Sequence, residues 1–233
     1  ISSGAIYSKT MSRLNNQTDC RPILDTLVVK IPYINTSALG DSVSYSNIQF
    51  NRLILGVLQN NPDWPRYIHG EIMNLSSLMY HPLIESLGFG SILSSKLFYK
   101  LLPSIGVVTL FFPDKSNINN KLTTNPSSDS VVIDYTLSNN QEILMKSVVK
   151  KVKKFLLTLG CIPRGGINYS YGSGIHYAGT IPMGVECDEY GKSIKFNNLY
   201  IADSSAFPSL PSKPITINSI VFSSFVATNS FGS

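Results

Sequence analysis

The feature that most restricts the fold is one long amphipathic segment, residues 139–159, whose two ends are both marked in the sequence. Ser138 and Gln141 stand three residues apart and form a capping box, in which each side chain pairs with a backbone N–H that the first helical turn leaves free. Gly160 follows at the position where helices often end in a left-handed residue. Apolar residues spaced three and four apart mark the face that we expect to be buried: Leu144, Val148, Val152, Phe155 and Leu159. The segment is therefore predicted to be a helix that packs on a core.

The other faces of this helix are rich in lysine: Lys146, Lys150, Lys151, Lys153 and Lys154. Charged helix faces are usually solvated, and cations near a helix C-terminus are favoured by the macrodipole. A patch that binds an anionic surface is the alternative interpretation. Because this stretch is the largest contributor to a net charge of only +5, we expect helix solubility and no nucleic-acid partner.

Short apolar runs bounded by turn residues indicate strands in the rest of the first two thirds. The predicted strands cover residues 22–35, 47–59, 66–73, 105–112 and 130–136. Between them we expect two short helices in 75–102, a turn at 113–116 and a loop at 116–129. Strands come in clusters, without a regular strand–helix alternation and without an internal repeat. This order favours an α+β domain with a mainly antiparallel sheet.

Composition excludes several other classes of protein. Hydrophobic residues make up 43% of the 233 residues and charged residues 14%, which is not typical of a disordered chain. Three cysteines are too few for a disulfide scaffold, and we expect Cys161 and Cys187 to be buried thiols. No apolar run reaches the roughly 18 residues that span a bilayer. The first residues, from Ile1, lack the pattern of a signal peptide, so we expect the chain to open inside a domain, as a fragment would.

The last third of the chain carries the candidate catalytic and cofactor-binding residues. His176 lies in a glycine-flanked loop, and a histidine can accept a proton near neutral pH. A predicted strand at 199–202 ends in Asp203, where an acid and free N–H groups can bind the hydroxyls and phosphates of a nucleotide. A further helix is expected from about Ile215. By spacing alone both residues also have structural explanations, a loop histidine that pairs with backbone and an aspartate in an N-cap or Asx turn.

Two motifs in this region favour a functional role for both residues over a structural one. The sequence reads His-x-x-Gly-Thr-x-x-Met-Gly at 176–184, then Leu-x-Ile-x-Asp-x-Ser-x-x-Pro at 199–208, then a helix start that contains proline and threonine. This pattern, over residues 174–228, resembles the C-terminal signature of the glucose–methanol–choline (GMC) flavin oxidoreductases. Near the other end of the chain, residues 3–8 resemble a second signature of that family, although Lys9 replaces the expected proline.

The resemblance implies a fold and a division into domains. The nucleotide-binding Gly-x-Gly-x-x-Gly of the family is not found in this sequence. The implied fold is an α+β, antiparallel-sheet substrate domain with helices at 21–165, plus closing segments of an FAD-binding α/β domain whose N-terminal Rossmann part is absent. The closing segments are residues 1–20 and residues 166–233, the second of which completes the active site.

The same resemblance implies a function. It predicts a flavoprotein that binds FAD and oxidises a CH–OH group of a small-molecule alcohol or sugar by hydride transfer to the flavin. The chain alone is expected to be inactive without the missing N-terminal FAD-binding region or subunit. A cytoplasmic location follows, with peripheral contact to a membrane left open. A degenerate, non-catalytic binding or interaction module of the same fold is the alternative.

The family's site residues carry over position by position. His176 matches the catalytic histidine, which accepts the proton of the alcohol. The second catalytic position, usually histidine or asparagine, falls on Pro214, or on Lys213 with a shift of one residue. Proline has no side-chain donor, so Lys213 is the candidate substitute, which could stabilise an alkoxide or a reduced flavin. The expected cofactor-binding residues are Gly4, Asp203, Ser204, Pro214, Ile215 and Thr216.

Two further chemistries receive less support. A hydrolase that uses Ser204 or Ser205 with His176 and Asp203 lacks a Gly-x-Ser-x-Gly elbow. His69 and Glu71 would share one face of a strand and form a possible metal pair. Two ligands without a third make a poor metal site, so no metal is expected.

Overall fold

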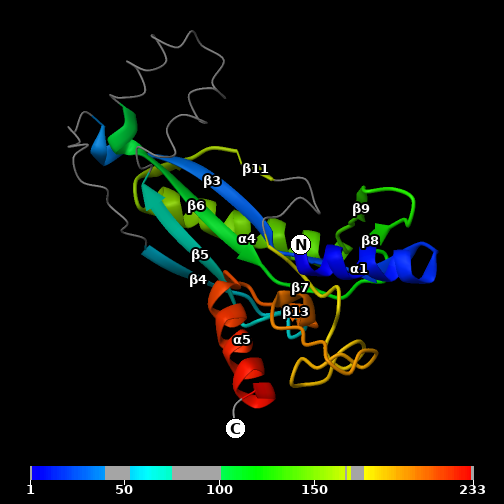
Figure 1. Ribbon diagram of the computed structural model, residues 1–233. Coiled ribbons are helices and arrows are strands. Elements are labelled where there is room, and N and C mark those ends of the chain that lie inside the picture. The colour runs from blue at the N-terminus through cyan, green and yellow to red at the C-terminus, as the bar shows by residue number, and fades with distance from the viewer. Residues whose placement is uncertain (1, 40–52, 75–100, 166, 169–175, 232–233) are drawn as a thin grey trace.

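The protein has a mixed α+β fold with antiparallel sheets, as the sequence predicts (Figure 1). The computed structural model describes residues 2–39, 53–74, 101–165, 167–168 and 176–231. Predictions for residues 47–52 and 75–100 lie outside these ranges.

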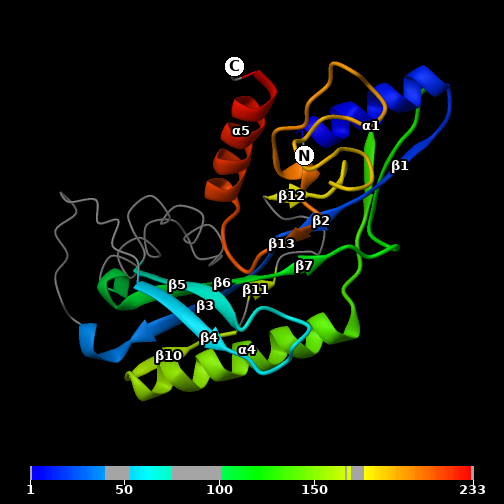
Figure 2. The ribbon, with the colours of Figure 1, turned by 90° about the horizontal axis from the view of Figure 1, so that it is seen from below.

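The largest element is a six-stranded antiparallel sheet with β3 and β6 at its centre. The strand order is β10-β3-β6-β5-β4, and β11 also pairs with β3. The strand bounds are β3 Leu27–Asn35, β4 Leu53–Leu58, β5 Tyr67–Asn74, β6 Ile105–Phe112, β10 Cys161–Pro163 and β11 Ile167–Asn168. One face of this sheet is covered by α4 (Asn139–Thr158), and α5 (Thr216–Phe231) lies on the other side (Figure 2).

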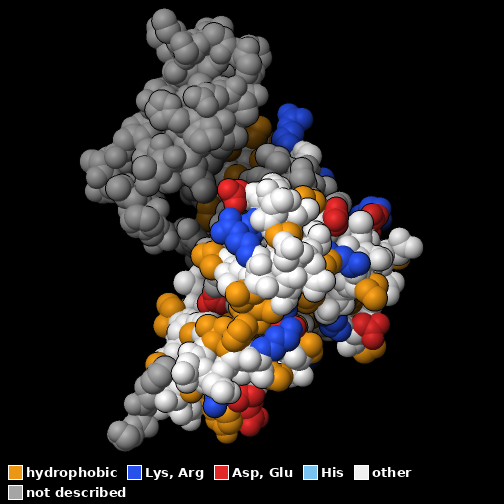
Figure 3. Space-filling view, turned by 45° about the vertical axis from the view of Figure 1, so that its right-hand side comes forward, with side chains coloured by type: hydrophobic (Ala, Val, Ile, Leu, Met, Phe, Trp, Pro, Cys, Tyr) orange, Lys and Arg blue, Asp and Glu red, His pale blue; other side chains and the backbone are white. Residues whose placement is uncertain are grey.

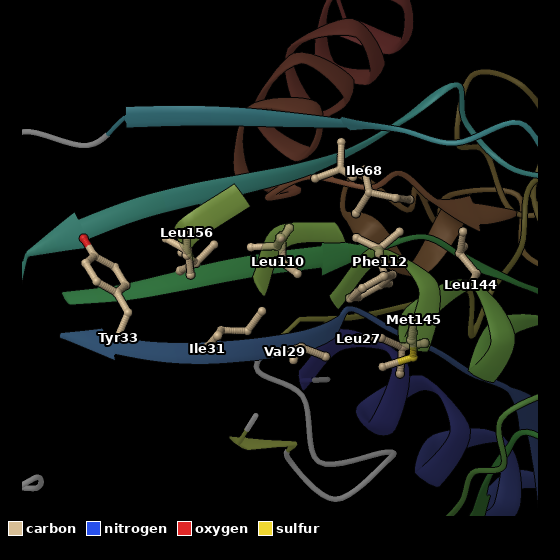
Figure 4. Close-up of a cluster of buried hydrophobic side chains, with 14 of the residues drawn as sticks. Leu27, Val29, Ile31, Tyr33, Ile68, Leu110, Phe112, Leu144, Met145 and Leu156 are labelled. Carbon is tan, nitrogen blue, oxygen red and sulfur yellow. The ribbon is translucent and has the colours of Figure 1, made fainter. Parts of the chain in front are cut away.

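The main core lies between α4 and this sheet (Figure 4). Side chains alternate along β3, so that every second residue from Leu27 to Tyr33 is buried. Apolar residues from β4, β5, β6, β10 and α4 complete the cluster: Val57, Ile68, Val108, Leu110, Phe112, Leu144, Met145, Val148, Val152, Leu156 and Cys161.

Helix α4 confirms the prediction for its ends and corrects it for its buried face. The capping box of Ser138 and Gln141 is present, and Gly160 has φ +72°. The predicted buried residues Phe155 and Leu159 are instead 43% and 53% exposed, and Leu156 is buried in their place. Phe155 and Leu156 lie three and four residues after Val152, and both are apolar. Helical spacing allows either of them on the buried face, so the sequence alone could not show which one packs on the sheet.

A second layer surrounds the entry to α5 and is built from short elements. Helix α1 (Ser2–Asn15) packs beside the three-stranded sheet β1-β8-β9. Two small pairs, β2-β12 and β7-β13, join distant parts of the chain. The bounds are β1 Asp19–Pro22, β2 Leu24–Asp25, β7 Asp114–Lys115, β8 Lys121–Thr124, β9 Val131–Asp134, β12 Tyr177–Ala178 and β13 Ser209–Leu210, with 3₁₀ turns η1 Thr36–Ala38, η3 Leu102–Ser104 and η4 Ser204–Ala206.

Several strand predictions are confirmed and others need correction. Strands β5 and β6 and the start of α5 agree with the predictions. The predicted strand 22–35 is divided into β2 and β3 and overlaps the end of β1. The predicted turn and loop at 113–129 are wrong in part, because they contain β7 and β8. Strand β8 buries Leu122 and Thr124 in alternation, a pattern that its polar Asn and Thr surroundings obscured.

The strand predicted at 199–202 is also wrong. Tyr200 forms a single bridge to Lys192, and Ile201 N donates to Gly191 O across the loop of residues 192–200. Cys161 and Cys187 are buried as predicted, and Cys20 is exposed. Within the described ranges, no helix has both the length and the apolar character that crossing a bilayer requires.

Candidate functional site

The two halves of the C-terminal motif lie side by side. The segment that begins with β12 runs along η4, and three of its N–H groups donate to successive carbonyl groups there. These bonds are Gly179 N to Ser204 O at 3.2 Å, Ile181 N to Ser205 O at 2.9 Å and Met183 N to Ala206 O at 2.9 Å. Residues far apart in the chain are therefore held in fixed register beside His176.

Side chains at the start of η4 strengthen this junction. Ser204 Oγ donates to the carbonyl of Tyr177, the residue after His176, at 2.9 Å. Asp203 is the N-cap of η4, and its Oδ1 accepts hydrogen bonds from the N–H of Ser205, at 2.9 Å, and from its hydroxyl. His176 is half-buried, and its carbonyl accepts a hydrogen bond from Thr26 N at 3.1 Å. The N-cap explanation of Asp203 thus holds, and the bond from Ser204 to Tyr177 joins the segment that carries Asp203 to the segment that carries His176.

The entry to α5 contacts the same segment through Ile215. This side chain is 5% exposed and packs in a cluster with Leu24, Ala178 and Leu210. Lys213 and Thr216 on either side of it are exposed, and Pro214 is half-buried. Ile215 thus anchors the loop to β12, two residues from His176, while its neighbours stay open to a ligand. The contact of Ile215 and Pro214 with a cofactor remains a prediction.

Gly4 has a packing role that the sequence did not reveal. It lies in α1, and a Cβ at this position would stand 2.0 Å from Thr180 Oγ1. Thr180 belongs to the motif that starts at His176, so the absence of a side chain at Gly4 lets α1 approach that motif. Glycine in a helix costs up to about 1 kcal/mol relative to alanine, which this close packing offsets.

A groove with a volume of about 810 Å³ opens between α1 and residues 196–205. Its walls are mostly apolar and include Ile6, Met11, Leu14, Phe196 and Leu199, and Asp203 is one of its polar lining residues. Further apolar side chains are exposed on α5, among them Ile217, Ile220 and Val221. Figure 3 shows hydrophobic side chains gathered over the lower part of the molecule, where α5 lies in Figure 1.

A buried charged network ties α1 and β1 to the loop after the motif. Arg21 is 5% exposed, and its Nε lies 2.7 Å from Asp19 Oδ2 and its Nη1 2.9 Å from Glu186 Oε1. The Arg21 guanidinium also lies 5.0 Å from the centroid of the Tyr7 ring. Burial would lower the pKa of Arg21, but the hydrogen bonds and charges of Asp19 and Glu186 raise it above its ordinary value. The cation thus stays charged inside the protein.

A second buried polar group, Asp114, lies behind β2. Its side chain accepts hydrogen bonds from Asp25 N at 2.9 Å, Tyr135 Oη at 2.7 Å and Gln141 Nε2 at 2.9 Å. Burial raises the pKa of Asp114, and these hydrogen bonds oppose the rise. Asp114 therefore joins the N-terminus of α4 to the strand whose next residue, Thr26, holds the carbonyl of His176. No local signal in the sequence identifies Asp114 or Arg21, because their partners are distant in the chain.

The His69–Glu71 pair exists, with 3.9 Å between His69 Nε2 and Glu71 Oε1. Among the residues that the structure describes, no group of three or more His, Cys, Asp or Glu side chains could hold a metal ion. Cys187 is also unsuited to nucleophilic or ligand chemistry at neutral pH, because burial raises the pKa of its thiol to about 11.

Within the described residues, the segment after His176, the acid-capped turn η4 and the entry to α5 thus meet in an antiparallel α+β fold. In the comparison with protein families, residues 125–222 match the family described as GMC oxidoreductase. These residues thus correspond to the C-terminal part of a GMC oxidoreductase. The match includes His176, Asp203 and the entry to α5, but not α1. No curated protein matches the chain.

Proposed function

We propose that the protein is an FAD-dependent oxidoreductase that oxidises a CH–OH group of an alcohol or sugar, with His176 as the base. The observation that carries the proposal is the convergence of three motif segments on β12. His176 directly precedes β12, Ser204 (the neighbour of Asp203) donates to the carbonyl of Tyr177, and Ile215 packs with Ala178. In the proposed division, residues 21–165 form the substrate domain, and residues 1–20 and 166–233 complete the flavin domain.

The residues present fit such a cofactor. Asp203 is a half-buried acid that lines a mostly apolar groove, which suits a hydroxyl-bearing chain joined to a flat ring. Asp203, Ser204 and Thr216 would hold FAD, and Gly4 supports the motif from behind. Bound FAD would supply the hydride acceptor of the reaction. An upstream FAD-binding region or subunit belongs to this proposal.

The residues of this chain would accept the proton of the substrate and stabilise the charge that develops on its oxygen. The imidazole of His176 accepts the proton of the substrate hydroxyl, while the hydrogen bond from Thr26 to its carbonyl keeps the loop in place. The exposed ammonium of Lys213 stabilises negative charge on the substrate oxygen as the proton leaves. Pro214 and Ile215 fix the backbone from which Lys213 extends.

The test is flavin reduction by alcohols. The protein, expressed together with its upstream coding sequence and supplied with FAD, is mixed without oxygen with ethanol, benzyl alcohol and glucose, and flavin absorbance is followed. We expect bleaching by at least one alcohol, and His176→Gln should slow it roughly 10²- to 10⁴-fold with the flavin still bound. Glu189→Gln, at an exposed turn, serves as the control. A colourless wild-type protein would contradict the proposal.

The presence of proline at position 214 favours a second candidate, a binding module that keeps the fold without the chemistry. If the protein is such a binding module, the rate of flavin reduction by any alcohol should be the same for His176→Ala as for the wild-type protein. The hydrolase hypothesis has less support, because both serine hydroxyls already donate hydrogen bonds elsewhere. Ser204 donates to the carbonyl of Tyr177, and Ser205 donates to the carboxylate of Asp203. Labelling of either serine by a fluorophosphonate would restore it.

A further inference from the structure

The face of the six-stranded sheet that points away from α4 carries a group of polar side chains. Ile68 is buried in the core with α4, so its neighbour His69 and then Glu71 point to the opposite face. In the strand register, Glu71 pairs with Thr109, and Thr109 pairs with Lys30 on the next strand. These four polar residues thus share one region of a sheet that is otherwise mostly apolar.

This face is joined directly to the entry of α5. Ser212 is 5% exposed and bridges two strands: it accepts a hydrogen bond from His69 N at 3.0 Å and donates one to Phe111 O at 2.5 Å. Its next neighbour in the chain is Lys213, one of the candidate catalytic residues. Figure 2 shows the same arrangement, with α4 and α5 on opposite sides of the sheet. His69 therefore lies beside the segment before α5, which carries Lys213 of the proposed active site.

The surroundings of His69 restrain its ring. The His69 and Glu71 side chains are only 16% and 13% exposed, and their Nε2 and Oε1 atoms are 3.9 Å apart. The imidazole also lies against the Phe111 ring, with 5.8 Å between centroids. A half-buried imidazole beside a carboxylate and an aromatic ring is held in a limited set of orientations, which is how a group that recognises a substrate is prepared. The segment Lys213–Thr216 contributes no imidazole of its own.

We propose that His69, oriented by Glu71, is a second imidazole of the active site. It donates a hydrogen bond to the reacting oxygen of the substrate, while His176 accepts that oxygen's proton. No proton leaves His69 in this step, so its contribution is stabilisation of the developing negative charge. This inference rests on the proposed function, since the reacting oxygen is that of the alcohol.

The experiment compares His69→Leu, His69→Gln and Glu71→Gln with wild-type protein in the anaerobic flavin reduction assay. We expect His69→Leu, which removes the donor, to lower kcat and kcat/KM together, about 10²-fold, because a hydrogen bond to the oxyanion strengthens in the transition state. His69→Gln retains a donor and should recover part of the rate. Glu71→Gln should lose about tenfold. Glu142→Gln, which breaks an exposed ion pair with Lys146 on α4, is the matched control and should lose nothing.

Thermal unfolding and flavin content are measured on every variant, since a structural role would move those quantities as well. A loss of rate that follows a loss of folded protein, or a rise in KM alone, assigns His69 a structural role and overturns the inference. If His69→Leu fails to fold, His69→Gln and Glu71→Gln decide in the same way. If the wild-type protein reduces flavin and all three variants do so at the same rate, only the role of His69 is refuted. Wild-type protein that reduces no flavin refutes the proposed function, and the inference with it.

Discussion

The two layers of the protein are stabilised by different interactions. The sheet that packs on α4 is held by apolar side chains, with Ile31, Val108 and Leu110 fully buried. The layer around β12 has strands of two to four residues and is joined by side-chain hydrogen bonds, buried charges and one close helix contact. Apolar burial depends on volume and tolerates similar side chains, whereas polar junctions require particular partners. The candidate active site therefore lies in the layer whose stability we expect to depend most on individual side-chain contacts.

The strongest test of this difference is Arg21→Met, which keeps an apolar stem but removes the charge. We expect a loss of about 3 kcal/mol or more in the free energy of unfolding, because Asp19 and Glu186 would be left buried without their cation. Denaturant unfolding measures the change. Lys195→Met removes the other cation near Glu186, but this side chain is 47% exposed and should cost less than about 1 kcal/mol. Equal effects of the two variants would mean that the charged network does not hold this layer.

The sheet should respond to volume instead. Leu156→Ala removes a side chain that is 1% exposed in the core, and we expect a loss of about 2–5 kcal/mol from the cavity it leaves. Leu157→Ala is the matched control, because this adjacent residue is 58% exposed and should change stability by less than about 0.5 kcal/mol. A small loss at Leu156 would show that α4 is not held by its apolar face.

The comparison also explains which parts of the structure the sequence could predict. The ends of α4 and the bounds of β6 depend on residues close in the chain, such as Ser138, Gln141 and Gly160, so local patterns identified them. Asp114 and Asp25 are 89 residues apart, and no periodicity reports such a contact. Leu122 escaped prediction because β8 is short and polar around it. The site segments were located only through a family resemblance, which carries information about distant contacts that spacing does not.

The smallest expected effect tests the closest contact in the site layer. Gly4→Ala would normally stabilise a helix by up to about 1 kcal/mol. Here the new Cβ would meet Thr180 Oγ1 at 2.0 Å and Thr180 Cβ at 2.8 Å, so we expect a net loss of about 1–2 kcal/mol as α1 moves away from the motif. Denaturant unfolding measures the sign as well as the size of the change.

Gly165→Ala is the control for that substitution, because nothing lies within 4 Å of a Cβ at that position, and it should leave stability within about 0.5 kcal/mol of wild type. Adding Thr180→Gly to Gly4→Ala removes both clashing atoms, so the double variant should lose less than the sum of the two single variants. Additive losses would mean that α1 does not rest on the motif at Thr180. The packing explanation of Gly4 would then fail, and a direct contact between Gly4 and the cofactor would be the better account of that glycine.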